Sequence, residues 1–240
     1  PPAHSHTLIE AYWPPACENH AMTITLLDGP LGTELIARGH QCPAPAWSAA
    51  AIEAAPEDIS AIHAAYAHAG AVVHTTNTFR TRPDAVGSRW TELAQQAVHL
   101  AKKAVPPNHR IAGSMAPLSD CYRPDLSPTH PKAAHAALAH VLAAQHVDIL
   151  LCETFPHIGE AEAATSAAIE TGIETWVSFT AGPDGTLLTP DQIRRGAERA
   201  IALGASAILV NCTPASETKQ FLTAIADLGV PFGAYANAGH

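Results

Sequence analysis

The feature that most constrains the fold of this chain is a repeated alternation between two kinds of segment. From about residue 23 onward, short apolar runs rich in β-branched residues alternate with longer, alanine-rich stretches. This alternation is typical of βα units built around a parallel sheet. The apolar runs are nearly continuous, as expected for strands covered on both faces. We predict seven strands, at residues 23–28, 71–78, 110–116, 147–153, 175–180, 205–212 and 230–237.

The stretches between these runs predict helices, and several end at a glycine. The helices are expected at residues 56–69, 90–104, 132–145, 159–170, 191–203 and 216–228. The glycines that follow them are Gly70, Gly172, Gly204 and Gly229. A helix commonly ends at a residue in the left-handed conformation, which glycine adopts without steric cost. The glycines therefore support the predicted boundaries.

Polar residues gather where the predicted strands end. They are Asp28, Thr76, Asn77, Ser114, Glu153, Thr180, Asn211, Cys212 and Asn237. In a (β/α)₈ barrel these ends converge on one face and form the active site. An open doubly wound sheet also binds ligands at its strand ends, but no GxGxxG or GxxxxGK[ST] motif follows any strand here. We therefore predict an α/β protein of the (β/α)₈ TIM-barrel class, with about seven of its eight βα units present.

Length and composition limit the domain organisation and the partners. The 240 residues fit one large domain, which we place at 23–240, after a proline-rich N-terminal arm at 1–22. The net charge of −9 and the scattered basic residues argue against nucleic acid or an anionic membrane as partner. Five cysteines are too few and too widely spaced for a disulfide framework, which favours free thiols in a reducing compartment. With no membrane-length apolar stretch, we expect a cytoplasmic protein with a small-molecule partner.

Fifteen histidines raise the question of a metal site. His63, His68, His135 and His140 lie among alanines in predicted helices, and no HExxH or comparable spacing occurs. We interpret them as ordinary surface or helix positions.

Six blocks of sequence resemble a known family, and they occur in that family's order. They are LLDGPLGTEL at 26–35, TTNTF at 75–79, GSMAP at 113–117, LCETFP at 151–156, VSFT at 177–180 and VNCT at 210–213. On these blocks the chain resembles the homocysteine S-methyltransferase family from about residue 26 to 239. The resemblance implies a (β/α)₈ barrel that binds a thiol amino acid and a catalytic Zn²⁺ at its C-terminal face.

The resemblance also implies roles for individual residues. Family members hold zinc with three cysteines: one matches Cys212, and the other two form an adjacent pair in a Gly-Gly-Cys-Cys block after the eighth strand. Carboxylates that match Asp28 and Glu153 hold the amino group of the substrate. Thr76 matches a position that contacts the substrate, and Asn211, in the same block as Cys212, is expected to do likewise.

The chemistry fits those residue types. A free thiol has a pKa near ~8.5 and is mostly protonated at neutral pH, whereas the thiolate is the nucleophile. Zinc held by cysteine thiolates lowers the thiol pKa and leaves one position open for the substrate sulfur. The expected reaction moves a methyl group from a small onium donor (S-methylmethionine, S-adenosylmethionine or betaine) to homocysteine, giving methionine.

The chain departs from the family pattern at one point. It contains no Cys-Cys pair, so Cys212 would be present without the other two of the three expected zinc ligands. We expect both ends to be cut, since the chain begins at Pro1 without methionine and stops at His240 directly after an apolar run. A barrel lacking its last strand would expose two sheet edges, so we expect such a fragment, made alone, to be poorly soluble or to associate.

Other interpretations remain open at this stage. A non-catalytic relative could bind an amino acid or a partner through the barrel mouth. A Schiff-base lyase is disfavoured, because Lys102, Lys103, Lys132 and Lys219 all fall in helical stretches. Cys212 could be a buried structural thiol, as we expect Cys121 and Cys152 to be. Glu153 could instead pair with Arg123, in the segment 120–125 that is expected to line the mouth of the site.

Overall fold

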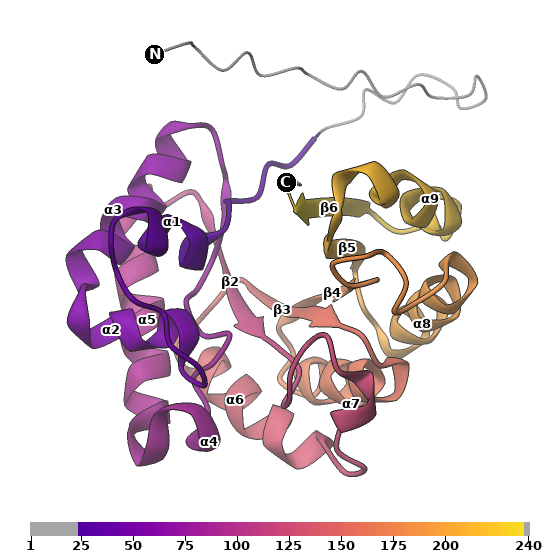
Figure 1. Cartoon of the computed structure of the whole chain (residues 1–240), viewed down its shortest axis with the longest axis horizontal. Helices are drawn as coiled ribbons and strands as arrows, with labels where there is room; N and C mark the ends of the chain where they lie inside the picture. The colour runs from indigo at the N-terminus through magenta and orange to yellow at the C-terminus, as the bar shows by residue number, and fades with distance from the viewer. Residues whose placement is uncertain (1–23, 238–240) are drawn as a thin grey trace.

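The computed structural model describes residues 24–237, and six parallel strands form one curled sheet with helices packed around its outside (Figure 1). The strand order follows the sequence from β1 to β6. The predicted arm at 1–22 lies outside the described residues. The strands are β1 Val73–Thr75, β2 Arg110–Met115, β3 Ile149–Phe155, β4 Glu174–Phe179, β5 Ala207–Pro214 and β6 Phe232–Asn237.

The helices lie between the strands along the chain, as the βα pattern predicts. The α-helices are α1 Leu31–Ala37, α2 Ala51–Ala54, α3 Pro56–His68, α4 Pro83–Val86, α5 Trp90–Ala104, α6 Lys132–Ala144, α7 Ile158–Ile169, α8 Pro190–Leu203 and α9 Ala215–Ile225. Short 3₁₀ turns occupy Trp47–Ala50, Gly87–Arg89 and Pro124–Leu126. The long helices match their predicted ranges to within two or three residues at each end. No described helix is long and apolar enough to cross a membrane.

The glycines at the helix ends behave as predicted. Gly70, Gly172, Gly204 and Gly229 have φ angles of 103°, 77°, 114° and 78°. These values lie in the left-handed region that other residues avoid. Each glycine therefore reverses the chain from a helix toward the next strand.

The prediction of a strand at residues 23–28 is wrong for the residues that the structure describes. Only Leu27 forms a bridge there, in parallel with Val73 of β1. Ile24 and Leu26 are 79% and 52% exposed, so burial does not extend the pairing on this side. The described sheet is thus a curled, open arc of six strands, and the count of eight βα units is not reproduced in it.

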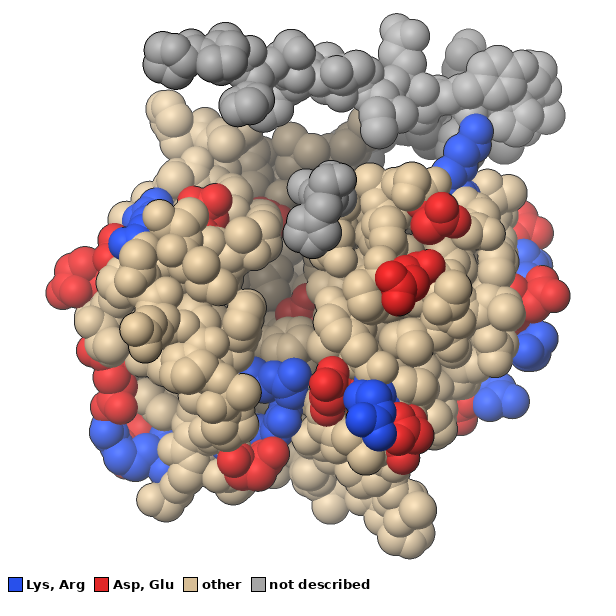
Figure 2. Space-filling view, in the orientation of Figure 1, with Lys and Arg blue, Asp and Glu red and all other residues tan. Residues whose placement is uncertain are grey.

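The sheet has an apolar layer on each of its two faces, which explains the continuous apolar runs. Every residue of β3 is buried. The concave face carries Val73, Ala112, Ile149, Leu151, Trp176, Ala207 and Leu209. The larger outer layer includes Leu150, Cys152, Val177 and Ile208, which pack with the helices. The molecule is hollowed at the centre of the face in Figure 2, and acidic atoms are visible inside the hollow.

Candidate active site at the strand ends

Hydrogen bonds connect the polar residues at the strand ends into one network. The Asp28 carboxylate accepts from the Thr75 amide at the end of β1, and Thr76 follows directly. The Thr76 hydroxyl accepts from the amide of Ser114 at 3.2 Å, and the Ser114 hydroxyl donates to Glu153 on β3. Consecutive strands thus place these predicted site residues side by side, although they lie far apart in the sequence.

Glu153 is a buried carboxylate, and the described side chains that hydrogen-bond to it are both hydroxyl groups. Ser114 donates to one of its oxygens, and the Tyr235 hydroxyl of β6 donates to the other at 2.9 Å. Burial raises the pKa of Glu153 to about 7 despite these two hydrogen bonds, and the negative charge of Asp28 adds to the increase. The alternative ion pair with Arg123 is wrong, because Arg123 pairs with Asp125 at 2.6 Å. Among the described residues no cationic side chain pairs with Glu153, so a positively charged ligand would stabilise its ionised form.

Asp28 is fixed by the backbone of the neighbouring strand. Its Oδ2 atom accepts from the Thr75 amide at 2.9 Å and lies 3.7 Å from Nδ1 of His63. Its side chain is 3% exposed. A Cβ atom on the next residue, Gly29, would lie 2.6 Å from the ring of Tyr66, so any other residue here would require this ring to shift. The Asp-Gly turn therefore brings the carboxylate close against helix α3.

Thr76 is buried, and its hydroxyl is used within the protein. It shares a hydrogen bond with the Thr78 hydroxyl at 2.8 Å and accepts from the Ser114 amide. The Thr78 hydroxyl in turn donates to the Ser114 carbonyl at 2.8 Å. These bonds fix the end of β1 against β2, which holds Ser114 in place for its contact with Glu153.

Asn211 joins two irregular strand ends. The registers of β3 with β4 and of β5 with β6 shift at Cys152/Phe155 and at Asn211/Pro214. At these shifts Thr154 and Cys212 have φ angles of 62° and 51°, in the left-handed region. The Asn211 side chain accepts from the amide of Thr154 at 3.1 Å and donates to its hydroxyl at 2.7 Å. Bulges of this kind change the direction of side chains next to active sites. Here the side-chain amide of Asn211 contacts both irregular segments, at Thr154 and at Cys212.

The Cys212 sulfur lies among polar side chains. The Sγ atom lies 3.3 Å from Nδ2 of Asn211 and 3.9 Å from the Thr154 hydroxyl. The Tyr122 hydroxyl also shares a hydrogen bond with it, which places the loop 120–125 at the mouth as predicted. Burial, together with the charge of Glu153, raises the pKa of the Cys212 thiol to about 12. Without a cation beside it, this thiol stays protonated.

The resemblance implies a zinc ion held by three cysteines, one of which matches Cys212. Over residues 24–237, no histidine, carboxylate or second cysteine completes a ligand group with Cys212. Cys121 and Cys152 are buried in the protein and Cys42 is half-buried, and all four described cysteines are free thiols, as predicted. The described residues therefore do not by themselves form a three-cysteine zinc site.

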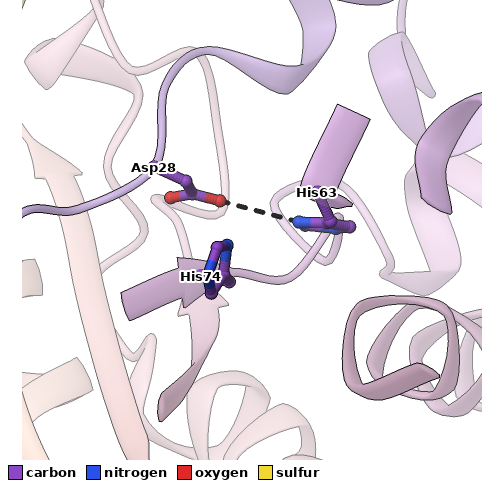
Figure 3. A group of neighbouring side chains, drawn as sticks. All are labelled: Asp28, His63 and His74. Atoms are coloured by element: carbon purple, nitrogen blue, oxygen red, sulfur yellow. Dashed lines mark ion pairs between the residues drawn. The ribbon is translucent and has the colours of Figure 1, made fainter. Parts of the chain in front are cut away.

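Two histidines lie behind Asp28, and neither was predicted as a site residue. His63 of α3 and His74 of β1 are both fully buried, and with Asp28 they form the one described group whose ligand atoms all lie within 4.8 Å of each other (Figure 3). His135 is also buried, 3.3 Å from Glu160. His68 and His140 are exposed, as expected for surface positions. The signal that was missed is spacing, since His63 follows Ile59 and Ile62 on the buried face of α3.

The chain is similar in sequence to known proteins. The sequence model of the family "Homocysteine S-methyltransferase" matches residues 25–240. The homocysteine S-methyltransferase of Escherichia coli K12 is 32% identical over 90% of this chain and 78% of its own length. The S-methylmethionine–homocysteine S-methyltransferase BHMT2 of Rattus norvegicus is 28% identical, and betaine–homocysteine S-methyltransferase 1 of Sus scrofa is 26% identical. The match covers 46% of the former and 70% of the latter.

The fold agrees as well. The crystal structure of the homocysteine methyltransferase MmuM from Escherichia coli in its metallated form superimposes with a TM-score of 0.81. The sequence identity is 27%, and the match covers 91% of this chain and 85% of that one. A family match over nearly the whole chain, a relative above 30% identity and a shared fold point to the same conclusion: this chain belongs to the homocysteine S-methyltransferase family of enzymes.

Proposed function

We propose that the protein transfers a methyl group from a small onium donor to the sulfur of homocysteine, giving methionine. The observation that carries the proposal is the pair of buried carboxylates at the strand ends. The negative charge of Asp28 contributes to the raised pKa of Glu153, and no described cationic side chain pairs with Glu153. The α-ammonium group of an amino acid would compensate both charges. Cys212 is close enough for its own pKa to be raised by the charge of Glu153.

Each proposed residue has a distinct task. Glu153 and Asp28 bind the ammonium group, and Ser114 and Tyr235 keep Glu153 oriented through their hydroxyls. Thr76 lines the same strand ends, and Asn211 orients the Cys212 sulfur. Holding donor and thiol in one orientation contributes to the rate by proximity.

The reaction is a displacement at carbon. The substrate thiol loses its proton to solvent, its sulfur lone pair forms the new S–CH₃ bond, and the bond between the methyl group and the onium atom breaks. The onium atom keeps the electron pair of that bond and becomes uncharged as the demethylated donor leaves. Two of the relatives are named for S-methylmethionine and betaine, which supports a small onium donor here.

We also propose Cys212 as a zinc ligand. Zinc bound by thiolates would lower the pKa of the substrate thiol. Because the described residues provide only this ligand, the remaining donors would have to come from outside residues 24–237. The same observation favours a second candidate function, a relative that binds the amino acid without turning it over.

A donor-resolved assay with matched cysteine variants separates these possibilities. Methionine formation from homocysteine is measured with S-methylmethionine, S-adenosylmethionine and betaine, and zinc content is measured in parallel. Cys212→Ser should lower turnover by about two orders of magnitude or more and release zinc. Cys42→Ser, a half-buried cysteine packed in a different apolar cluster, is the control and should keep both. Homocysteine binding without turnover with any donor would support the non-catalytic candidate, and unchanged zinc in Cys212→Ser would remove Cys212 from the metal site.

A further inference from the structure

A fully buried histidine, His63, lies directly behind the Asp28 carboxylate. It comes from α3, which covers the outside of the sheet beside β1. Neither of its ring nitrogens has a hydrogen-bond partner among the described residues. Its Nδ1 atom is 3.7 Å from Oδ2 of Asp28. In Figure 3 the ring points at this oxygen, while the other oxygen of Asp28 points away from the histidines.

The burial of His63 constrains where its proton lies. A neutral imidazole carries one N–H donor and one acceptor lone pair. A buried donor without an acceptor is costly, and a carboxylate is the strongest acceptor available to it. The Asp28 oxygen is at ion-pair distance from Nδ1, so the tautomer protonated at Nδ1 is the one that gives the donor a partner. A small movement of either side chain would close this gap to a hydrogen bond.

The neighbouring His74 has one ring nitrogen in a hydrogen bond, while its Nδ1 atom has no hydrogen-bond partner among the described residues. Nε2 of His74 shares a hydrogen bond with Nδ1 of His109 at 3.0 Å, and these two rings stack with centroids 5.3 Å apart. The His63 and His74 rings meet edge to face at 6.2 Å. Burial lowers the pKa of His74, which keeps this ring neutral. His63 is therefore the histidine nearest to forming a direct contact with the carboxylate.

We propose that His63 is a positioning residue for Asp28. It directs its Nδ1–H group at Oδ2 and, together with the Thr75 amide, fixes the carboxylate so that the second oxygen is presented to the ammonium group of the substrate. The inference rests on the proposed function, because His63 would act on the substrate only by orienting the carboxylate that binds its ammonium group.

A metal ion bound by Asp28, His63 and His74 is the competing explanation for the same cluster. Their ligand atoms lie within 4.8 Å of one another. However, Oδ2 of Asp28 already accepts from the Thr75 amide, and the side chains of Asp28 and His63 are 3% and 0% exposed. An ion there would also neutralise the carboxylate that the substrate needs. Positioning gives the buried Nδ1 atom of His63 a partner without these costs.

The experiment compares two amides that place their NH₂ group at different depths. His63→Asn puts the amide nitrogen close to the position of Nδ1, whereas His63→Gln carries it toward the position of Nε2. His63→Leu removes the donor, and the exposed His68→Leu on the same helix is the matched control. Homocysteine affinity, KM and kcat are measured for each variant and for Asp28→Asn. The bound zinc or other metal is quantified in all of them.

If His63 positions Asp28, the homocysteine Kd and KM should rise by about tenfold in His63→Gln and His63→Leu. In His63→Asn they should stay within about twofold, and kcat should change little throughout. In the Asp28→Asn background, the difference between His63→Leu and His63 should largely disappear. Equal losses in the Asn and Gln variants, or additive effects with Asp28→Asn, would overturn the role. Loss of one equivalent of metal in the His63 variants would overturn it too, in favour of a metal site.

A double-mutant cycle on unfolding keeps the inference separate from the proposed function. Non-additive stabilities of His63→Leu and Asp28→Asn report the contact even in the absence of substrate. A wild-type protein that neither binds nor methylates homocysteine, with this coupling present, refutes the proposed function and the substrate role of His63 together. A wild-type protein that binds homocysteine, with no difference among the His63 variants, refutes the inference alone.

Discussion

Replacing Glu153 by glutamine should make the protein more stable and weaken its binding of homocysteine. Glu153 has a pKa of about 7 in the folded protein, against an ordinary value of 4.5. Between these two pH values the folded protein holds a proton that the unfolded chain has lost, so the free energy of unfolding falls as pH rises through this window. At about 1.4 kcal/mol per pH unit, the full penalty above pH 7 amounts to about 3 kcal/mol.

Glutamine removes this penalty because it cannot ionise. Its carbonyl can still accept from one of the two hydroxyls, Ser114 or Tyr235, and its amide can donate to the other. Urea unfolding at pH 5, 6, 7 and 8 should therefore show Glu153→Gln gaining up to about 3 kcal/mol over wild type at pH 8. The gain should shrink toward pH 5. Homocysteine affinity should move the other way and fall by about tenfold or more, because the ammonium group loses a charged partner.

The control is Glu57→Gln, an exposed carboxylate in the first turn of α3. It should leave the shape of the stability curve unchanged. If Glu153→Gln is less stable than wild type at pH 8, or its stability follows pH with the wild-type slope, then Glu153 is not the isolated buried carboxylate described above. If stability rises as expected but homocysteine affinity is unchanged, the electrostatics are right and the substrate role is wrong.

Two further predictions concern the scaffold of the site. Burial opposes ionisation of Glu160, but its hydrogen bonds with His135, the Leu118 amide and the Ser127 hydroxyl hold its pKa below the ordinary value. The contribution of Glu160 to the free energy of unfolding is therefore present above the unfolded pKa and lost as pH falls through the folded pKa. In urea unfolding, Glu160→Gln should lower the free energy of unfolding by about 3 kcal/mol at pH 7 and by less near pH 4. An equal loss at both pH values would contradict this. Gly29→Ala should lower the free energy of unfolding by about 1–3 kcal/mol through the clash with Tyr66. In a Tyr66→Ala background, thermal unfolding should show a smaller loss of stability from Gly29→Ala. If the two substitutions are fully additive, the ring does not limit this position.

The fold was largely readable from the sequence because its strands and helices repeat one pattern. Strands covered on both faces give apolar runs, and each of the six strands that the structure forms overlaps its predicted range and extends beyond it by at most two residues. The predicted strand at 23–28 was not formed for a physical reason: apolar residues alone do not make a strand where, as at Ile24, the side chain remains exposed. Family membership, predicted from ordered blocks, is confirmed.

The site was only partly readable. Polar residues at strand ends could be predicted, because the parallel topology brings those ends together. The partners of Glu153 could not, since its contact with Tyr235 spans 82 residues and depends on the curl of the sheet. His63 was missed because histidine on an apolar helix face has the same sequence pattern as a core residue. The roles of Asp28, Thr76, Glu153, Asn211 and Cys212 in substrate and metal binding stay predictions.

At Cys212 the left-handed backbone conformation lowers stability, whereas the proposed activity requires the thiol. A non-glycine residue with φ near 51° carries a conformational cost of about 1–2 kcal/mol. Glycine would remove this cost, so selection for thermal tolerance alone would favour replacing the cysteine. The thiol would be lost with it, and under the proposed function so would turnover. Under the proposed function a cysteine would be kept at this position for its sulfur, whereas glycine in a laboratory-evolved variant would signal that only the scaffold had been selected.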